Sequence, residues 1–110
     1  MANKKNISLA QVLNLKDAIE YSKDAIVSKT ILDKKTGTLT LFAFAAGQAL
    51  SEHTAPFDAL IQVLDGQAQI KIGGKAHKVS AGEIVLMPAN IPHAVKAVRK
   101  FKMLLTMIRS

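Results

Sequence analysis

Two histidines, His53 and His93, are the side chains of this sequence best suited to chemistry near neutral pH. An imidazole can coordinate a divalent metal ion, bind an anion when it is protonated, or move a proton. The sequence contains no cysteine, so disulfides, thiolate metal sites and cysteine nucleophiles are excluded. Any metal ion would therefore have to be held by histidine and carboxylate. The third histidine, His77, lies within another predicted strand, and we expect it to have an exposed or structural role.

Glycine, proline and asparagine occur at regular distances from both histidines. Five residues separate Gly47 from His53, and Gly66 follows further along the chain. The second pattern consists of Gly82, Pro88, Asn90 and His93. This spacing resembles the two signature motifs of the cupin superfamily, whose members are small jelly-roll barrels. The resemblance implies an all-β cupin jelly-roll barrel, a double-stranded β-helix, formed by residues 37–108 within a single domain of residues 1–110.

The match to these motifs is incomplete at four positions. In a complete cupin site, three histidines and one glutamate point into the barrel and hold manganese, iron, nickel or zinc. Here the second histidine is replaced by Ala55 and the glutamate by Ala59. Asn90 stands where the second motif has glycine, and Ala97 stands where it has asparagine. Asparagine adopts the left-handed turn conformation more readily than most residues with a side chain, so Asn90 is the mildest departure.

The resemblance therefore leaves His53 and His93 as the metal ligands that the motifs supply. Imidazole suits these ions, but two ligands alone make a weak or incomplete site. Residues two apart on a strand share a face, so Ala55 should lie beside His53 and add only a methyl group. Glu52 and Asp58 are each offset by one residue from a ligand position and should face away, although a bulge before Asp58 would bring its carboxylate into the site.

Apolar side chains should surround the two histidines inside the barrel. Of these we expect Phe42, Met87 and Met103 to contact a ligand, because such side chains line organic pockets and methionine adapts to irregular molecules. The other inward-facing apolar residues should be ordinary core, and they are Phe44, Ile61, Val63, Leu105 and Met107.

Short apolar runs separated by turn residues predict a β-protein from residue 37 onward. The predicted strands cover residues 38–45, 59–64, 67–72, 75–79, 84–87, 93–98 and 101–108. Two dipeptides, Asp65-Gly66 and Gly73-Gly74, predict tight hairpin turns between successive strands, since they tolerate positive φ angles.

The first 30 residues predict a short N-terminal helix or arm that leads into a first strand. Ser8 is followed three residues later by Gln11, which is a capping pattern, and apolar residues follow Ser8 at helical spacing. Residues 26–32 are apolar enough to form a strand.

The composition is that of one globular domain. Hydrophobic residues make up 49% of the 110 residues and charged residues 21%, which is far from the balance of a disordered chain. The formal net charge is +7, but the basic residues are scattered without interleaved aromatics, so we expect no nucleic-acid partner. No run approaches the roughly 20 apolar residues of a membrane span, so we expect a cytoplasmic protein with no membrane partner. Cupins of this size usually form homodimers in which N-terminal segments add to the neighbour's sheet, and the resemblance implies a homodimer here.

These observations support two functional hypotheses. The first is a barrel that binds a small organic molecule near His53 and His93, with anions well suited, without necessarily performing chemistry. The alternative is a metal-dependent enzyme, such as a dioxygenase, decarboxylase or isomerase, with the same two histidines as ligands. A third class, an interaction module acting through its sheet edges, would bind neither. The sequence leaves open whether the chain is an enzyme and which molecule it binds.

Overall fold

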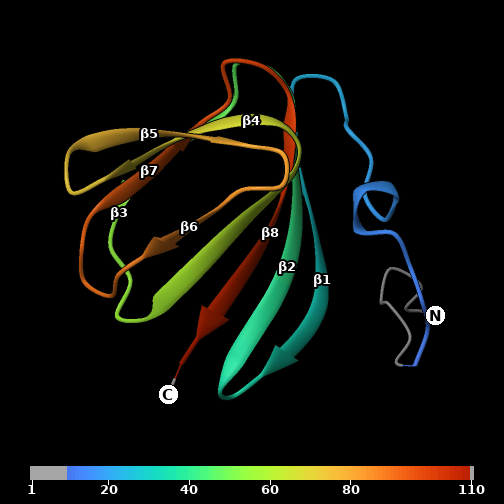
Figure 1. The fold of residues 1–110 in the computed structure, drawn as a ribbon, viewed down its shortest axis with the longest axis horizontal. Helices are drawn as coiled ribbons and strands as arrows, with labels where there is room; N and C mark the ends of the chain where they lie inside the picture. The colour runs from blue at the N-terminus through green and yellow to red at the C-terminus, as the bar shows by residue number, and fades with distance from the viewer. Residues whose placement is uncertain (1–9, 110) are drawn as a thin grey trace.

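One curled antiparallel sheet forms the body of the protein (Figure 1). The structure is a computed structural model, and it describes residues 10–109. Its strands, in chain order, are β1 (Ile26–Lys34), β2 (Gly37–Phe44), β3 (Ala49–His53), β4 (Asp58–Ile72), β5 (Lys75–Ser80), β6 (Ile84–Met87), β7 (His93–Lys96) and β8 (Phe101–Ile108). The order along the sheet is β1-β2-β8-β4-β7-β3, with β5 and β6 each paired to β4.

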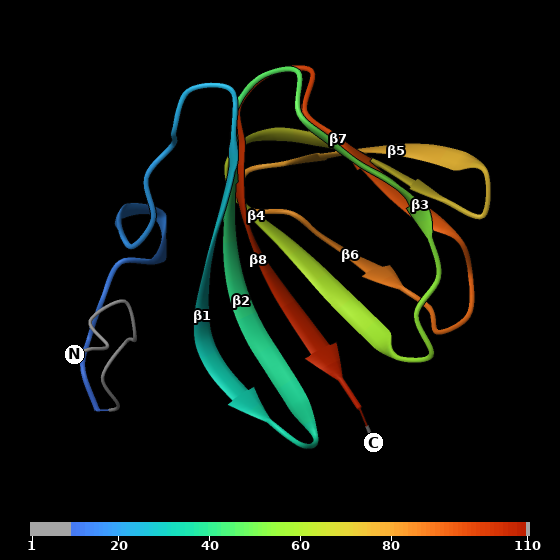
Figure 2. The ribbon, with the colours of Figure 1, turned by 180° about the vertical axis from the view of Figure 1, so that it is seen from behind.

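The long strand β4 belongs to both halves of this sheet. Its first part pairs with β6 and β8, and its second part pairs with β5 and β7. We call β1, β2, β6, β8 and residues 58–66 sheet A, and we call β3, β5, β7 and residues 67–72 sheet B. The two sheets diverge from β4, as Figures 1 and 2 show from opposite sides. The architecture is the predicted all-β jelly roll.

The predicted hairpin at Asp65 and Gly66 is wrong, because β4 continues through both residues. Gly66 has a φ of +75° and remains paired with Phe101 of β8. The register shifts between Val63 and Asp65, which is a bulge that bends the strand from sheet A into sheet B. The glycine therefore bends a continuous strand and does not end it.

The other predicted strands agree with the observed ones to within two residues at each end. Gly73 and Gly74 form the predicted turn between β4 and β5, with φ angles of +57° and +83° as a tight hairpin requires. β3 is the strand that the apolar pattern does not predict, because its sequence is short and four of its five residues are exposed.

A cluster of apolar side chains fills the space between the inner faces of sheets A and B. The fully or nearly buried members are Phe44, Ala59, Ile61, Val63, Ala68, Ile70, Val79, Met87, Val95, Ala97, Phe101 and Met103. Two aromatic rings stack at its centre, those of Phe44 and Phe101, with centroids 4.6 Å apart. Burial of apolar surface is the main stabilisation that a chain without disulfides can draw on.

Of the two alternatives predicted for the N-terminal part, helix or arm, residues 10–25 form an arm. Ser8 of the capping pattern lies outside the described residues. Ala10 has a left-handed φ of +62°, and residues 11–14 have no helical structure. The helical turn that follows, η1 (Leu15–Asp17), is a three-residue 3-10 helix whose first turn is capped by the side chain of Asn14. None of the helices within residues 10–109 has the length and hydropathy to cross a membrane.

This arm packs on the outer face of sheet A, beside β1 (Figure 1). Ile19 is 3% exposed and forms a second small core with Leu41 and Ala43 of β2. The Tyr21 hydroxyl donates a 2.6 Å hydrogen bond to Oδ2 of Asp65. The arm is therefore joined to the sheet at the point where β4 bends.

Two lysines of the sheet hold the backbone at the end of η1. Nζ of Lys29 donates to the carbonyl of Ala18 at 2.7 Å, and Nζ of Lys102 donates to the carbonyl of Lys16 at 2.5 Å. Carbonyl groups at a helix end lack partners within the helix, so these bonds satisfy acceptors that would otherwise need water.

Candidate functional site

His53 and His93 are paired in register where the end of β3 meets the start of β7. The register of this pair of strands shifts between Leu50 and His53. Leu50 lies opposite Val95, and both side chains pack in the core. With regular alternation His53 would face the side opposite to Leu50, so the bulge is what turns it toward the interior.

The loop before His93 is held by backbone hydrogen bonds at both ends. The amide of Asn90 donates to the carbonyl of Ala55 at 2.7 Å, and the amide of Gly73 donates to the carbonyl of Pro92 at 2.8 Å. Asn90 has a φ of +66°, which is the left-handed conformation expected of it. These bonds fix the direction from which the chain enters β7.

The structure brings the two predicted histidines into direct contact. Their Nε2 atoms are 3.1 Å apart, and their ring centroids are 4.3 Å apart with an angle of 69° between the ring planes. His93 is 8% exposed, whereas His53 is exposed. The pair therefore has one ring in the protein and one ring accessible to solvent.

Each ring also faces a backbone carbonyl through its other nitrogen. Nδ1 of His53 lies 2.8 Å from the carbonyl oxygen of Ser51, and Nδ1 of His93 lies 3.3 Å from that of Ile91. A carbonyl oxygen can only accept, so both contacts are hydrogen bonds when each Nδ1 carries a hydrogen. Two neutral rings would then direct Nε2 lone pairs at each other, and a shared proton or metal ion would relieve that repulsion.

The donor set falls short of the four-ligand metal centre of a complete cupin site. The Nε2 spacing itself suits one ion, because two bonds of about 2.1 Å would subtend about 95° at the metal. The other two ligand positions hold Ala55, in the loop after β3, and Ala59, which is 5% exposed on β4. Within residues 10–109, no three His, Asp or Glu side chains are grouped to hold a metal ion. The residues present do not fit the complete metal centre.

Neither acidic neighbour replaces a missing ligand. Oδ1 of Asp58 accepts a 2.8 Å hydrogen bond from the amide of Ala89. β4 pairs regularly with β8 from Asp58 to Val63, so no bulge at Asp58 turns its side chain inward. Glu52 is exposed. The expectation that Ala55 shares a strand face with His53 is wrong, because β3 ends at His53 and Ala55 lies in the loop.

The apolar residues expected to contact a ligand lie on the inner side of the barrel. Met87 and Met103 are 4% and 1% exposed and belong to the core. Phe42 is on β2 opposite Met103 of β8, and its half-buried side chain packs against the same core. Their contact with a ligand stays a prediction. His77 is half-buried on β5 opposite Ile70, which fits a structural role.

Known proteins resemble this chain in both sequence and structure. The cupin domain family matches residues 40–109. A conserved protein of unknown function from Streptococcus pyogenes is 35% identical, with a TM-score of 0.90 and coverage of 96% of this chain and 92% of that chain. A cupin 2 conserved barrel domain protein from Leptotrichia buccalis is 42% identical, with a TM-score of 0.85 over 87% of this chain and 47% of that chain.

A cupin superfamily protein from Desulfitobacterium hafniense is 26% identical, with a TM-score of 0.88 and coverage of 96% of both chains. The comparison with curated proteins finds no match. The family match covers more than half of the residues, and the Streptococcus pyogenes protein is more than 30% identical over nearly the whole chain. This chain belongs to the cupin family.

Proposed function

We propose that this cupin binds a small organic anion at the His53–His93 pair. The observation that carries the proposal is the 3.1 Å contact between the Nε2 atoms while both Nδ1 atoms face carbonyls. One added proton turns the Nε2–Nε2 contact into a hydrogen bond and keeps both Nδ1–carbonyl hydrogen bonds. The ring that takes the proton donates through both of its nitrogens, and Nε2 of the other ring accepts. The pair then carries one positive charge at a partly open position, which suits a carboxylate or phosphate group.

The surroundings of the histidine pair support the proposal that its charge is balanced by a bound organic anion. No carboxylate in residues 10–109 forms an ion pair with either ring, so the protein supplies no partner for this charge. Ile72 lies opposite His93 and packs against the core, which gives the organic part of a ligand an apolar neighbour. Exposure of His53 leaves a direction of approach from solvent.

Matched charged and neutral molecules test this proposal. Benzoate and benzamide have nearly the same shape, as do acetate and acetamide, but only the first of each pair is an anion. We expect the anions to shift the ring-nitrogen NMR signals of both histidines and to raise the melting temperature, and the amides to do neither. His53→Ala should remove the response, whereas His77→Ala should keep it. Equal responses of the wild type and His53→Ala would overturn the proposal.

A two-histidine metal enzyme is the second candidate, favoured by the Nε2 spacing alone. Elemental analysis of untagged protein exposed in turn to manganese, iron, nickel and zinc separates the two. Stoichiometric metal that is lost in His53→Ala and in His93→Ala would favour the enzyme. If neither metal nor any anion changes the melting temperature, the protein would belong instead with interaction modules.

A further inference from the structure

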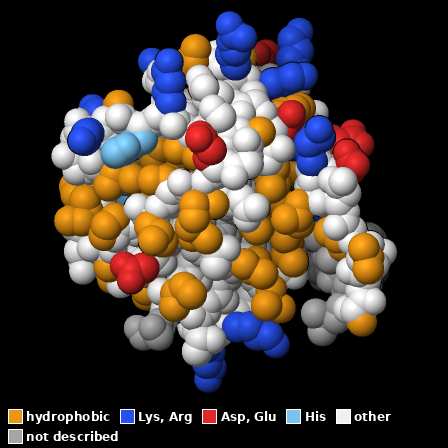
Figure 3. Space-filling view, in the orientation of Figure 1, with side chains coloured by type: hydrophobic (Ala, Val, Ile, Leu, Met, Phe, Trp, Pro, Cys, Tyr) orange, Lys and Arg blue, Asp and Glu red, His pale blue; other side chains and the backbone are white. Residues whose placement is uncertain are grey.

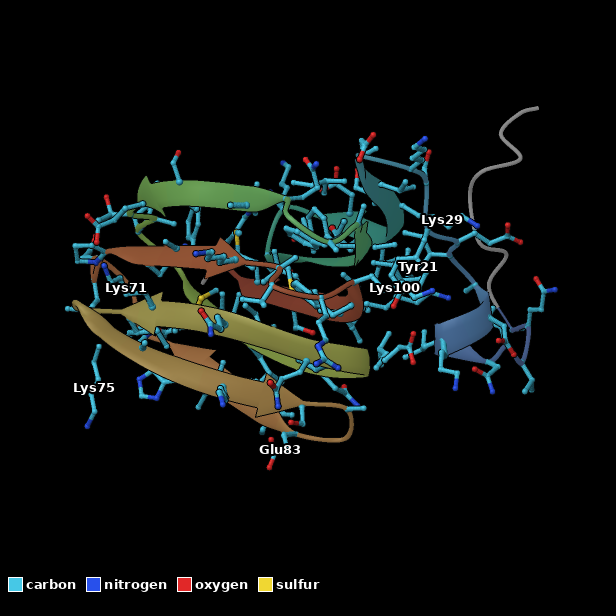
Figure 4. All side chains as sticks on the ribbon, turned by 90° about the horizontal axis from the view of Figure 1, so that it is seen from above. Tyr21, Lys29, Lys71, Lys75, Glu83 and Lys100 are labelled. Atoms are coloured by element: carbon cyan, nitrogen blue, oxygen red, sulfur yellow. The ribbon has the colours of Figure 1, made fainter. Side chains whose placement is uncertain are left out.

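Sheet B has an outer face that the histidine site does not use. Alternate residues of β4 and β7 point to opposite faces, so Ile70 and Val95 are buried in the core while Lys71 and Lys96 are exposed on the other side. Figure 4 views the molecule from above and shows the strands of sheet B side by side. Residues of the same two strands thus serve two separate surfaces.

A shallow cleft of about 360 Å³ lies on this outer face. Its lining includes Ala49, Ala76 and Ala94, whose methyl groups leave room between longer side chains. Ala76 and Ala94 flank Lys71 on the neighbouring strands, so the small residues and the lysine form one row across the sheet. The volume is within the range of pockets that hold small organic molecules.

The cleft carries positive charge without internal compensation. Lys71 lies opposite Ala94, and Lys96 lies two residues after Ala94 on the same face, so both ammonium groups adjoin this alanine. No Asp or Glu is among the residues that line the cleft. In the described part of the chain the one ion pair is Arg109 with Asp33, so neither lysine is paired.

We infer that this cleft binds a second small ligand with an apolar body and one anionic group. The anionic group, a phosphate or carboxylate, lies between Lys71 and Lys96, where it also meets the amide of Gln69. The apolar body lies over the alanines. This surface is separate from the histidine site, because the two face opposite sides of sheet B.

Phenyl phosphate, inorganic phosphate and phenol together test both parts of this inference. Phenyl phosphate has the apolar body and the anion, whereas each of the others has only one. In amide NMR titrations we expect phenyl phosphate to bind more tightly than either of the others and to shift signals of Ala76, Ala94 and Lys71. Added salt should weaken this binding, because exposed charges are screened. Phenol binding as tightly as phenyl phosphate would contradict the inference.

Single variants locate the binding on this face. Lys71→Ala and Lys96→Ala should each weaken phenyl phosphate binding by about threefold, as expected for one exposed charge contact. Lys75→Ala is the matched control, because Lys75 pairs with inward-facing Ile72 and so projects on the other face, yet its loss changes the net charge equally. Figure 4 labels Lys71 and Lys75 near the same end of sheet B.

The cleft can also be filled without changing charge. Ala76 is exposed, so Ala76→Leu should fold normally, reduce phenyl phosphate binding, and leave the weak binding of inorganic phosphate as it is.

Equal losses of phenyl phosphate affinity in Lys71→Ala and Lys75→Ala would show attraction to the net charge of +7 and would overturn the inference. His53→Ala should leave phenyl phosphate binding at this cleft unchanged, which separates the two proposed sites.

Discussion

Two methyl groups, those of Ala55 and Ala59, stand where a complete cupin site has its third and fourth metal ligands. Ala55 is half-buried in a loop, so a larger side chain there has room to reach solvent. Ala59 is 5% exposed and lies opposite Met87, so a carboxylate there would be buried among apolar groups. Burying an unpaired charge costs several kcal/mol, and a bound cation would offset that cost.

Restoring these ligands should therefore convert the histidine pair into a metal site. We expect Ala55→His with Ala59→Glu to bind one nickel or manganese ion per chain and to melt at a higher temperature with metal than without it. Ala55→His alone adds a third ligand without a buried charge. We expect the metal to raise its melting temperature less than that of the double variant. Metal content by elemental analysis checks both variants. Folded variants that take up no more metal than the wild type would show that the side chains at these positions do not converge.

The single tyrosine reports on the join between the arm and the sheet. Burial, the hydrogen bond to Asp65 and the negative charge of Asp65 together raise the pKa of Tyr21 well above its ordinary value of about 10. The folded chain thus holds this proton more tightly than the unfolded chain does. Stability from this proton is complete below about pH 10 and is lost as the pH rises above it.

Tyr21→Phe should remove this pH dependence and the hydrogen bond together. We expect the variant to be less stable by about 1 kcal/mol at pH 8, with the difference from the wild type shrinking toward pH 11. Urea denaturation at both pH values gives the difference between the free energies of unfolding of the two proteins. Lysine titration cancels in this difference because both proteins have the same lysines. The chain has one tyrosine and no tryptophan, so tyrosinate absorbance follows Tyr21 directly. A tyrosine that ionises near pH 10 in the folded protein would contradict the argument.

At the scale of elements, Gly66 is the residue that lets β4 serve both sheets. A Cβ at this position would collide with the carbonyl oxygen of Lys100 and lie 3.1 Å from Cα of Phe101, and the φ of +75° is strained for any side chain. Gly74 has a similar φ of +83°, but a Cβ there would meet nothing within 4 Å. Substitution of Gly74 therefore tests backbone strain alone, whereas substitution of Gly66 tests backbone strain together with steric collision.

Gly66→Ala should destabilise the protein more than Gly74→Ala does. Backbone strain alone costs about 1 to 3 kcal/mol at each position, and the collision at residue 66 adds to it. Urea denaturation of both variants gives the comparison. Equal losses would mean that the chain near Phe101 moves aside at little cost, and that the bend of β4 tolerates a side chain.

The same glycine shows where sequence patterns stop predicting this fold. Hairpins and strands that depend on local rules, such as Gly73-Gly74 and residues 101–108, could be predicted because turn chemistry and apolar alternation determine them. Gly66 obeys the same local rule but bends a strand, and only pairing with β8 distinguishes the two outcomes. The inward turn of His53 depends likewise on a bulge in β3 that pairing with β7 creates. The resemblance to the cupin motifs therefore identified the two histidines, and long-range register positioned them.

At the scale of the whole molecule, the two outer faces differ in character. The outer face of sheet B carries unpaired lysines, whereas hydrophobic side chains gather over β4, β6 and β8 of sheet A (Figure 3). Leu86 is 64% exposed and Ile84 is 59% exposed, and both lie on β6. Among the strands of residues 10–109, β6 pairs only with β4, so none of them pairs with the backbone groups along its other edge. Exposed apolar patches of this kind mark protein interfaces.

We expect two copies of the chain to associate through β6 and the apolar surface around it. A twofold axis beside β6 would place Leu86 and Ile84 against the same residues of the second copy. It would also pair the free edge of β6 with the identical edge of that copy. Sedimentation equilibrium should give twice the chain mass of 11.8 kDa for the wild type and the single mass for Leu86→Lys. Val98→Lys is the control, because Val98 is 57% exposed outside β6, and it should stay dimeric. A monomeric wild type would contradict the predicted dimer. A Leu86→Lys variant that remains dimeric would exclude this face and direct the search to the edges of β1 and β3.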